Sequence, residues 1–238
     1  MALLSESEAR TILNKVLALS KADECQVTLS GGRAGNLRFP RNTVSTAGGS
    51  DTLSLSISSS VGAKTGSVTV NELDDEALGR AVRAAEELAR LSPDNPEHMP
   101  LVGPQRYVEP KAYFASTAGI TQSDRVRWAG DSIRLCREKK LTAAGFLSDS
   151  ARFSAIANSK GLFGYQQRTD VDFSVTTRTE DGRGSGYGIA DCNDSAQLDA
   201  GAVTAVAARK ALQSVGARAI EPGKYTVVLE PSAGVTLV

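Results

Sequence analysis

Apolar and polar residues recur along this chain at two spacings, one typical of strands and the other of helices. Within residues 51–58, leucine and isoleucine at 53, 55 and 57 alternate with serine at 54, 56 and 58. A period of two places successive side chains on opposite faces of a strand. From residue 6 to residue 20, apolar residues recur instead at every third or fourth position, behind a capping-box pattern formed by Ser5 and Glu8. The first segment is therefore predicted to be a strand and the second a helix.

Read with these two periods, both halves of the chain show the same predicted order of helices and strands. In the first half, the helix at 6–20 precedes predicted strands at 25–30, 36–39, 43–46, 51–58 and 66–70 and a helix at 74–91. In the second half, a helix beginning at Ser123 precedes predicted strands at 141–147, 153–158, 162–167, 171–179 and 186–190 and a helix at 196–215.

This repeated order predicts the fold class. Strands joined by tight turns form antiparallel sheets, and helices then cover one face of such a sheet. The sequence therefore predicts an α+β fold of two helix–antiparallel-sheet–helix units in layers. Two unlike subdomains remain the alternative, since the two halves share little residue identity.

Proline content and the end of the chain suggest the domain boundaries. Five of the eight prolines fall between Ser92 and Pro110, which is typical of a linker or a long surface connection. After the turn signal Pro222-Gly223, residues 225–229 have the pattern of a buried strand. We expect a first unit at 1–92, a linker at 93–112, a second unit at 113–217 and, at 222–238, the first strand of a truncated β-rich domain.

Composition narrows the functional classes. The chain has 27 basic and 27 acidic residues, and this balance argues against direct nucleic-acid binding. No apolar run is long enough to span a membrane, and the first residues lack the pattern of a signal peptide. Cys25, Cys136 and Cys192 are odd in number and far apart, as expected of reduced thiols. These features predict a cytoplasmic protein without a membrane partner.

Few residues are candidates for chemistry. His98 is the single histidine and lies in a proline-flanked loop, so we interpret it as a solvent-exposed residue and not as a metal ligand. The cysteines lack Cys-x-x-Cys spacing, and each is interpreted as a small buried residue. Catalytic, cofactor-binding and metal-binding residues are all predicted to be absent from this chain.

Two further motifs have competing interpretations. The glycine-rich segment 182–188 lacks the Lys-Ser/Thr of a phosphate-binding loop, so a flexible hairpin or edge strand is the better prediction and a peptide contact the weaker one. Basic residues on the helix that begins at Ser123, Arg125 among them, interleave with acids and predict a solvated, salt-bridged face.

Four short motifs, taken in order, resemble the TldD/PmbA family, metallopeptidase-related proteins once called modulators of DNA gyrase. They are Glu24-Cys25-Gln26-Val27, the hairpin Val61-Gly62-Ala63-Lys64-Thr65-Gly66, the turn Asn158-Ser159-Lys160-Gly161, and Pro222-Gly223-Lys224-Tyr225 followed by Val227-Val228-Leu229.

The resemblance implies an α+β N-terminal part and a β-rich C-terminal part that follows the junction at 222–229. It also implies that catalytic members bind zinc through a His-Glu-x-x-x-His motif shortly after this junction, and that they cleave peptides or unfolded polypeptides as cytosolic dimers. Here Glu230-Pro231-Ser232-Ala233 follows instead, which is more similar to the non-catalytic PmbA-type branch. We therefore expect no zinc to bind to this chain itself.

Two functions are compatible with these observations. The leading hypothesis is the substrate-handling N-terminal part of a TldD/PmbA-type metallopeptidase system, in which the edge of an antiparallel sheet accepts an extended peptide. The alternative is a non-catalytic scaffold or partner subunit that binds proteins. The resemblance implies a homodimer, or a heterodimer with another family member.

Overall fold

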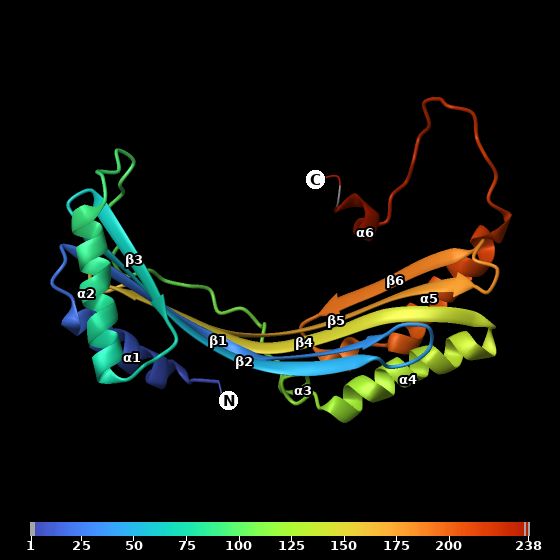
Figure 1. The fold of residues 1–238 in the computed structure, drawn as a ribbon, viewed down its shortest axis with the longest axis horizontal. Coiled ribbons are helices and arrows are strands. Elements are labelled where there is room, and N and C mark those ends of the chain that lie inside the picture. The colour runs from blue at the N-terminus through green and yellow to red at the C-terminus, as the bar shows by residue number, and fades with distance from the viewer. Residues whose placement is uncertain (1–2, 236, 238) are drawn as a thin grey trace. The chain divides into compact units, whose positions relative to one another are not determined.

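The computed structural model describes residues 3–235 and 237, which form an α+β fold around one antiparallel sheet (Figure 1). Its six strands follow the order β3-β2-β1-β4-β5-β6. The strands are β1 (Glu24–Phe39), β2 (Thr46–Val61), β3 (Lys64–Val70), β4 (Leu141–Asn158), β5 (Phe163–Thr179) and β6 (Ser185–Cys192). The α-helices are α1 (Glu6–Leu19), α2 (Asp75–Leu91), α3 (Ala115–Ala118), α4 (Gln122–Glu138), α5 (Ala200–Gln213) and α6 (Pro231–Gly234).

The order of elements repeats along the chain. One helix, three strands and a second helix occur as α1-β1-β2-β3-α2 and again as α4-β4-β5-β6-α5. The α+β class with antiparallel strands, predicted from the two periods, is confirmed. No helix of the described residues is both long enough and apolar enough to cross a membrane.

The chain divides into two compact units that are not simple halves of the sequence. Unit 1 comprises residues 1–34, 49–118 and 150–169, and unit 2 comprises residues 35–48, 119–149 and 170–238. Each of β1, β2, β4 and β5 therefore contributes residues to both units.

In unit 1, the helices α1 and α2 pack against one face of the sheet. Leu13 and Val16 of α1, and Leu78 and Val82 of α2, are buried among the odd-numbered residues of β1 and β2. Both helices begin at residues that the sequence marks: Ser5 and Glu8 complete the predicted capping box, and Asp74 accepts a hydrogen bond from the Ala77 N–H. Such caps satisfy backbone donors that a helix leaves free.

The opposite face of β2 and β3 carries a ladder of hydroxyl groups. Side chains paired across the two strands donate to one another, and such pairs stabilise the strand register. The pairs are Ser56 with Thr69 (3.2 Å), Ser58 with Ser67 (3.1 Å) and Ser60 with Thr65 (3.1 Å).

In unit 2, α4 and α5 cover the apolar face of the sheet. Phe39 and Phe173 stack there with ring centroids 6.2 Å apart, and Ile133 and Ala207 pack in the same core. Gly145 leaves room for Phe39, because a Cβ at this glycine would lie 2.2 Å from the ring.

Two carboxylates face each other on the other side of unit 2. Asp172 of β5 pairs directly with Asp191 of β6. The pKa of Asp172 is raised, first by burial and then by the charge of Asp191, while a hydrogen bond from Ser148 lowers it. Like charges directly opposite each other destabilise a strand pair.

We expect Asp172→Asn to stabilise unit 2 at neutral pH by up to about 1 kcal/mol, since Asn removes this repulsion. Because the folded pKa lies above the unfolded value, the ionised side chain costs stability only as the pH rises through the folded pKa. The gain should therefore shrink as the pH falls toward the ordinary aspartate pKa of about 3.9. Urea unfolding at several pH values measures it. A less stable variant at pH 7, or a gain that grows in acid, would show that the repulsion is not the cause.

The strands β1, β2, β4 and β5 are longer than the sequence predicts. The breaks expected at Gly31-Gly32 and between 147 and 153 do not occur, and β1 and β4 run through them. At Gly32 a Cβ would lie 2.4 Å from the carbonyl oxygen of Ala151. The glycine therefore permits a close approach of backbones rather than ending a strand.

Two other predictions about the C-terminal part are wrong. Residues 225–229 form no strand, and Val228 is 97% exposed, because no described strand pairs with this segment. The last long helix begins at Ala200 rather than at 196. Its buried face carries small residues such as Ala207.

Candidate functional site

The first half of β5 has a sheet edge without a neighbouring strand. β6 pairs with β5 only from Val171 to Arg178. Residues 163–170 of β5 precede this register, and the other neighbour of β5 is β4. Within the described residues, one edge of residues 163–167 therefore has no strand partner, and such an edge presents backbone donors and acceptors.

One hydrogen bond shows which backbone groups point outward. The Thr169 N–H donates to the carbonyl oxygen of Ala112 at 2.9 Å. Ala112 belongs to the connection between α2 and α3, so this N–H points away from β4. Backbone groups alternate between the two edges of a strand. Gln167 and Tyr165, two and four residues earlier, therefore direct their N–H and C=O groups to the same outer edge.

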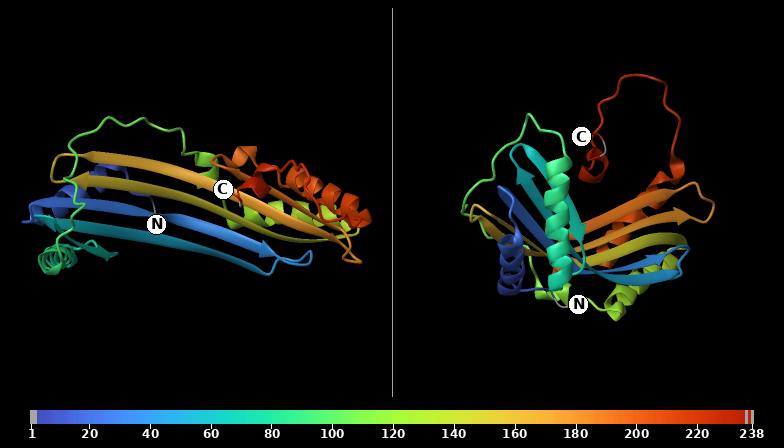
Figure 2. Two further views of the ribbon diagram at one scale, coloured as in Figure 1. Left: turned by 90° about the horizontal axis from the view of Figure 1, so that it is seen from above. Right: turned by 60° about the vertical axis from the view of Figure 1, so that its left-hand side comes forward.

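The connection itself, residues 92–114, runs beside β5 without helix or strand (Figure 2). Side chains of the strands hold its middle in place. The Leu101 N–H donates to Glu24 Oε2 at 3.1 Å, and Asn158 Nδ2 donates to the Val102 carbonyl oxygen at 2.9 Å. Most of its residues are exposed, so it forms an ordered strap and not part of the core.

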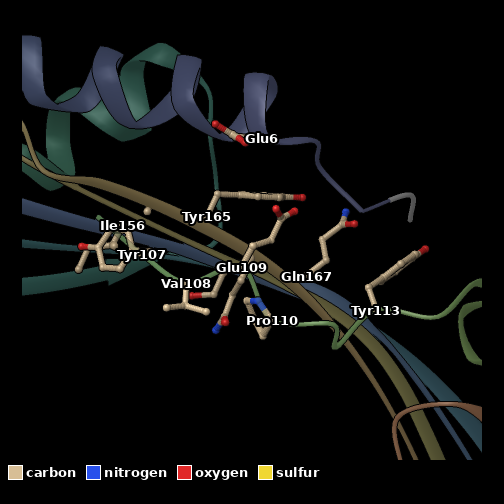
Figure 3. A pocket seen from close by; sticks show the side chains of 12 residues that line it. Glu6, Tyr107, Val108, Glu109, Pro110, Tyr113, Ile156, Tyr165 and Gln167 are labelled. Atoms are coloured by element: carbon tan, nitrogen blue, oxygen red, sulfur yellow. The ribbon is translucent and has the colours of Figure 1, made fainter. Parts of the chain in front are cut away.

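A pocket of about 660 Å³ lies between this strap and the strands. Most of its lining is polar or aromatic (Figure 3). The strap contributes Tyr107, Glu109 and Tyr113, the strands contribute Ile156, Tyr165 and Gln167, and α1 contributes Glu6.

Tyr165 is the best anchored of the three tyrosines. Its hydroxyl donates to the Leu4 carbonyl oxygen at 2.7 Å, and its ring stacks on Phe153 with centroids 6.4 Å apart. Burial raises the pKa of Tyr165, and the nearby charge of Glu6 adds to this rise. Tyr107 packs over Gly164, where a Cβ would lie 3.2 Å from its ring.

Two family models match the chain. The first, described as PmbA/TldA metallopeptidase domain 1, matches residues 25–89. The second, the PmbA/TldA metallopeptidase central domain, matches residues 115–215. Together they cover more than half of the sequence. The chain belongs to the PmbA/TldD family. Both matches lie inside the units predicted at 1–92 and 113–217, although those exact limits, and those of the segments at 93–112 and 222–238, stay a prediction.

Solved structures have the same fold. TldE from Thermococcus kodakarensis is 18% identical, with a TM-score of 0.77 over 85% of this chain and 47% of that chain. A protein titled a modulator of DNA gyrase, from Thermotoga maritima, is 16% identical, with a TM-score of 0.81 over 90% of this chain and 50% of that one. A similarly titled protein from Bacteroides thetaiotaomicron is 19% identical, with a TM-score of 0.78 over 96% and 54%.

These identities show the fold alone. The chain spans about half the length of the structures that it matches. No match was found among curated proteins.

The zinc that catalytic members of the PmbA/TldD family are expected to hold does not fit the residues of this chain. His98 Nε2 lies 3.9 Å from Glu24 Oε2, and Lys160 Nζ lies 3.3 Å from the other oxygen of that carboxylate. One histidine and one carboxylate that already faces an ammonium group are too few for a zinc site. Within the described residues, no group of three or more histidine, cysteine or acidic side chains could hold a metal ion.

The structure corrects the interpretation of His98 as solvent-exposed. Its side chain is only 21% exposed, because it packs beside Glu24 at the end of the strap. The cysteines are free, and Cys25 and Cys136 are buried, as predicted. Burial raises the pKa of the Cys136 thiol to about 11, so this residue stays a protonated thiol at neutral pH. Cys192 is only partly buried.

The glycine-rich segment has a packing role. It leads into β6, the edge strand of the sheet, as predicted. Gly184, Gly186 and Gly188 face α5, where a Cβ would lie 2.2, 2.0 and 2.5 Å from carbonyl oxygens of the helix. Gly66 of β3 meets α2 in the same way, with a Cβ position 2.4 Å from the Ala85 carbonyl oxygen. In both units, glycine lets a helix lie directly on an edge strand.

The basic face predicted for α4 is correct except at Arg125. Arg127 and Arg134 form exposed ion pairs with Asp124 and Asp131. Arg125, whose side chain is 12% exposed, binds the buried Asp149 instead.

Sequence reasoning missed the pocket. Its tyrosines come from the proline-rich connection and from the first half of β5, two segments far apart in the sequence. One available signal was the aromatic content of residues 107–114, which is unusual for a simple linker.

Proposed function

We propose that this chain is the substrate-handling part of a PmbA/TldD metallopeptidase system, and that it captures extended segments of peptides or unfolded polypeptides. The observation that carries the proposal is the outer edge of β5 at residues 163–167, which has no neighbouring strand among the described residues, with a pocket lined by tyrosine and glutamate side chains beside it. Family membership supplies the metallopeptidase context.

Capture would proceed by strand addition. The backbone groups of Tyr165 and Gln167 point toward the space between β5 and the strap, and the bond from Thr169 to Ala112 already forms one rung there. Each added backbone hydrogen bond contributes about 0.5–1.5 kcal/mol net. Because backbone groups are common to all sequences, a few such bonds give weak and sequence-tolerant binding, which suits a handler of varied peptides.

In this proposal, a metal-bearing partner or a further domain supplies the hydrolysis. The partner is a second copy or another family member, and the compartment is the cytoplasm. If the complete assembly captures peptides but does not cleave them, the chain instead has the alternative role of a non-catalytic partner subunit.

We expect Gln167→Pro to weaken binding of an extended peptide by about tenfold or more, because proline removes an outward N–H from the edge. The matched control is Gln167→Ala, which keeps this N–H and should bind more tightly than Gln167→Pro. Fluorescence anisotropy with a labelled peptide of alternating valine and threonine measures the affinity, and circular dichroism checks folding. Equal affinities for two folded variants would contradict strand addition at this edge.

A further inference from the structure

We propose that the pocket beside β5 selects a lysine or arginine side chain of the captured segment, with Glu109 as its counter-charge and tyrosine rings as its walls. The proposal rests on the proposed function, and it adds a preference that strand addition alone does not give. It concerns a basic side chain of an added strand, not a free cation.

The position of the pocket ties it to a captured strand. Gln167 and Tyr165 line the pocket and also direct their backbone groups to the open edge. Side chains of a strand alternate between its two faces. Every second side chain of an added strand would therefore lie on the same face as the side chains of Tyr165 and Gln167, which line the pocket.

Charge distinguishes Glu109 from the other carboxylate of the pocket. Glu6 is paired with Arg10 at 2.8 Å, so its charge is largely compensated. Glu109 has no ion pair or hydrogen-bond partner among the described residues. Lys111, the closest cation along the strap, is exposed and does not line the pocket. Figure 3 shows Glu109 between Tyr165 and Gln167, at the middle of the lining.

The walls suit a long basic side chain. Tyr107, Tyr113 and Tyr165 offer aromatic faces, which attract a cation by about 0.5–1 kcal/mol at exposed sites and more where water is excluded. The chain itself shows this preference nearby, because the Arg10 guanidinium lies 3.5 Å from the centre of the Phe163 ring. Ile156 and Val108 provide apolar contacts for the methylene stem. An acidic side chain would meet Glu109 and be repelled.

The test compares three acetylated, amidated peptides of alternating valine and threonine that carry lysine, norleucine or glutamate at the centre. Anisotropy with the full chain should show that the lysine peptide binds about tenfold tighter than the norleucine peptide. The glutamate peptide should bind weakest. Glu109→Gln should remove the preference for lysine over norleucine. The control Glu97→Gln, at an exposed position of the same strap outside the pocket, should keep it.

The outcomes separate this inference from the proposed function. Equal binding of the lysine and norleucine peptides, both sensitive to Gln167→Pro, would overturn the selection and leave peptide capture standing. A lysine preference that survives Glu109→Gln would also overturn it. If a norleucine peptide with a free N-terminus binds as tightly as the lysine peptide, the pocket holds a chain terminus and the assignment to a side chain is wrong. Absence of binding by every peptide would overturn both proposals.

Discussion

Arg125→Ala should destabilise the protein by about 3–5 kcal/mol, because it leaves a buried carboxylate without its counter-charge. Arg125 Nε and Nη2 donate to the two oxygens of Asp149 at 2.5 and 2.9 Å, and Nη1 donates to Gln122 Oε1 at 3.1 Å. The side chain of Asp149 is only 8% exposed. Urea denaturation followed by circular dichroism measures the free energy of unfolding.

The matched control lies on the same helix. Arg127 pairs with Asp124, and its side chain is 62% exposed, so Arg127→Ala should cost no more than about 1 kcal/mol. The double variant Arg125→Ala/Asp149→Ala should recover part of the loss, since it removes the uncompensated charge. Similar losses for Arg125→Ala and Arg127→Ala would show that the buried pair is not a main support of unit 2.

Gly186→Val should be the second large effect, with a loss of about 3 kcal/mol or more, because an added side chain meets backbone that cannot move aside. A Cβ at Gly186 would lie 2.0 Å from the Ala207 carbonyl oxygen and 2.6 Å from the Ala211 nitrogen. The helix α5 would have to lift from β6 to accept it. Thermal and urea unfolding both measure the loss.

Gly130→Ala, by contrast, should raise the stability of the protein. Nothing lies within 4 Å of a Cβ at this exposed position of α4, so alanine should stabilise the helix by about 0.5–1 kcal/mol. A Gly186→Val variant as stable as the parent would mean that α5 does not pack closely on β6.

Much of the fold could be predicted because hydrophobic periodicity and helix capping depend only on residues that are close in the sequence. The capping box at Ser5, the turn at Gly161 with φ 88°, and the repeated order of elements follow from short stretches of sequence. The continuity of β1 through Gly31-Gly32 could not be predicted in this way. It depends on β4, a strand that enters more than a hundred residues later.

In the C-terminal tail, by contrast, a strand is predicted where none forms. Residues 225–229 have strand-like composition, but a strand exists only where another backbone pairs with it, and no described strand does so here. The pocket escaped prediction for a related reason. Tyr107 and Glu109 lie in the segment that the sequence predicts to be a linker. They line a pocket only because Thr169 and Asn158 hold the strap beside β5.

Amide hydrogen exchange of the full chain, with and without a saturating lysine-bearing peptide, tests the central claim most directly. Strand addition predicts slower exchange of the Tyr165 and Gln167 amides, which point to the open edge. It predicts little change at Gly164 and Gln166, whose amides alternate toward β4. Unchanged exchange at Tyr165 and Gln167 with peptide bound would contradict the claim that this edge captures the peptide.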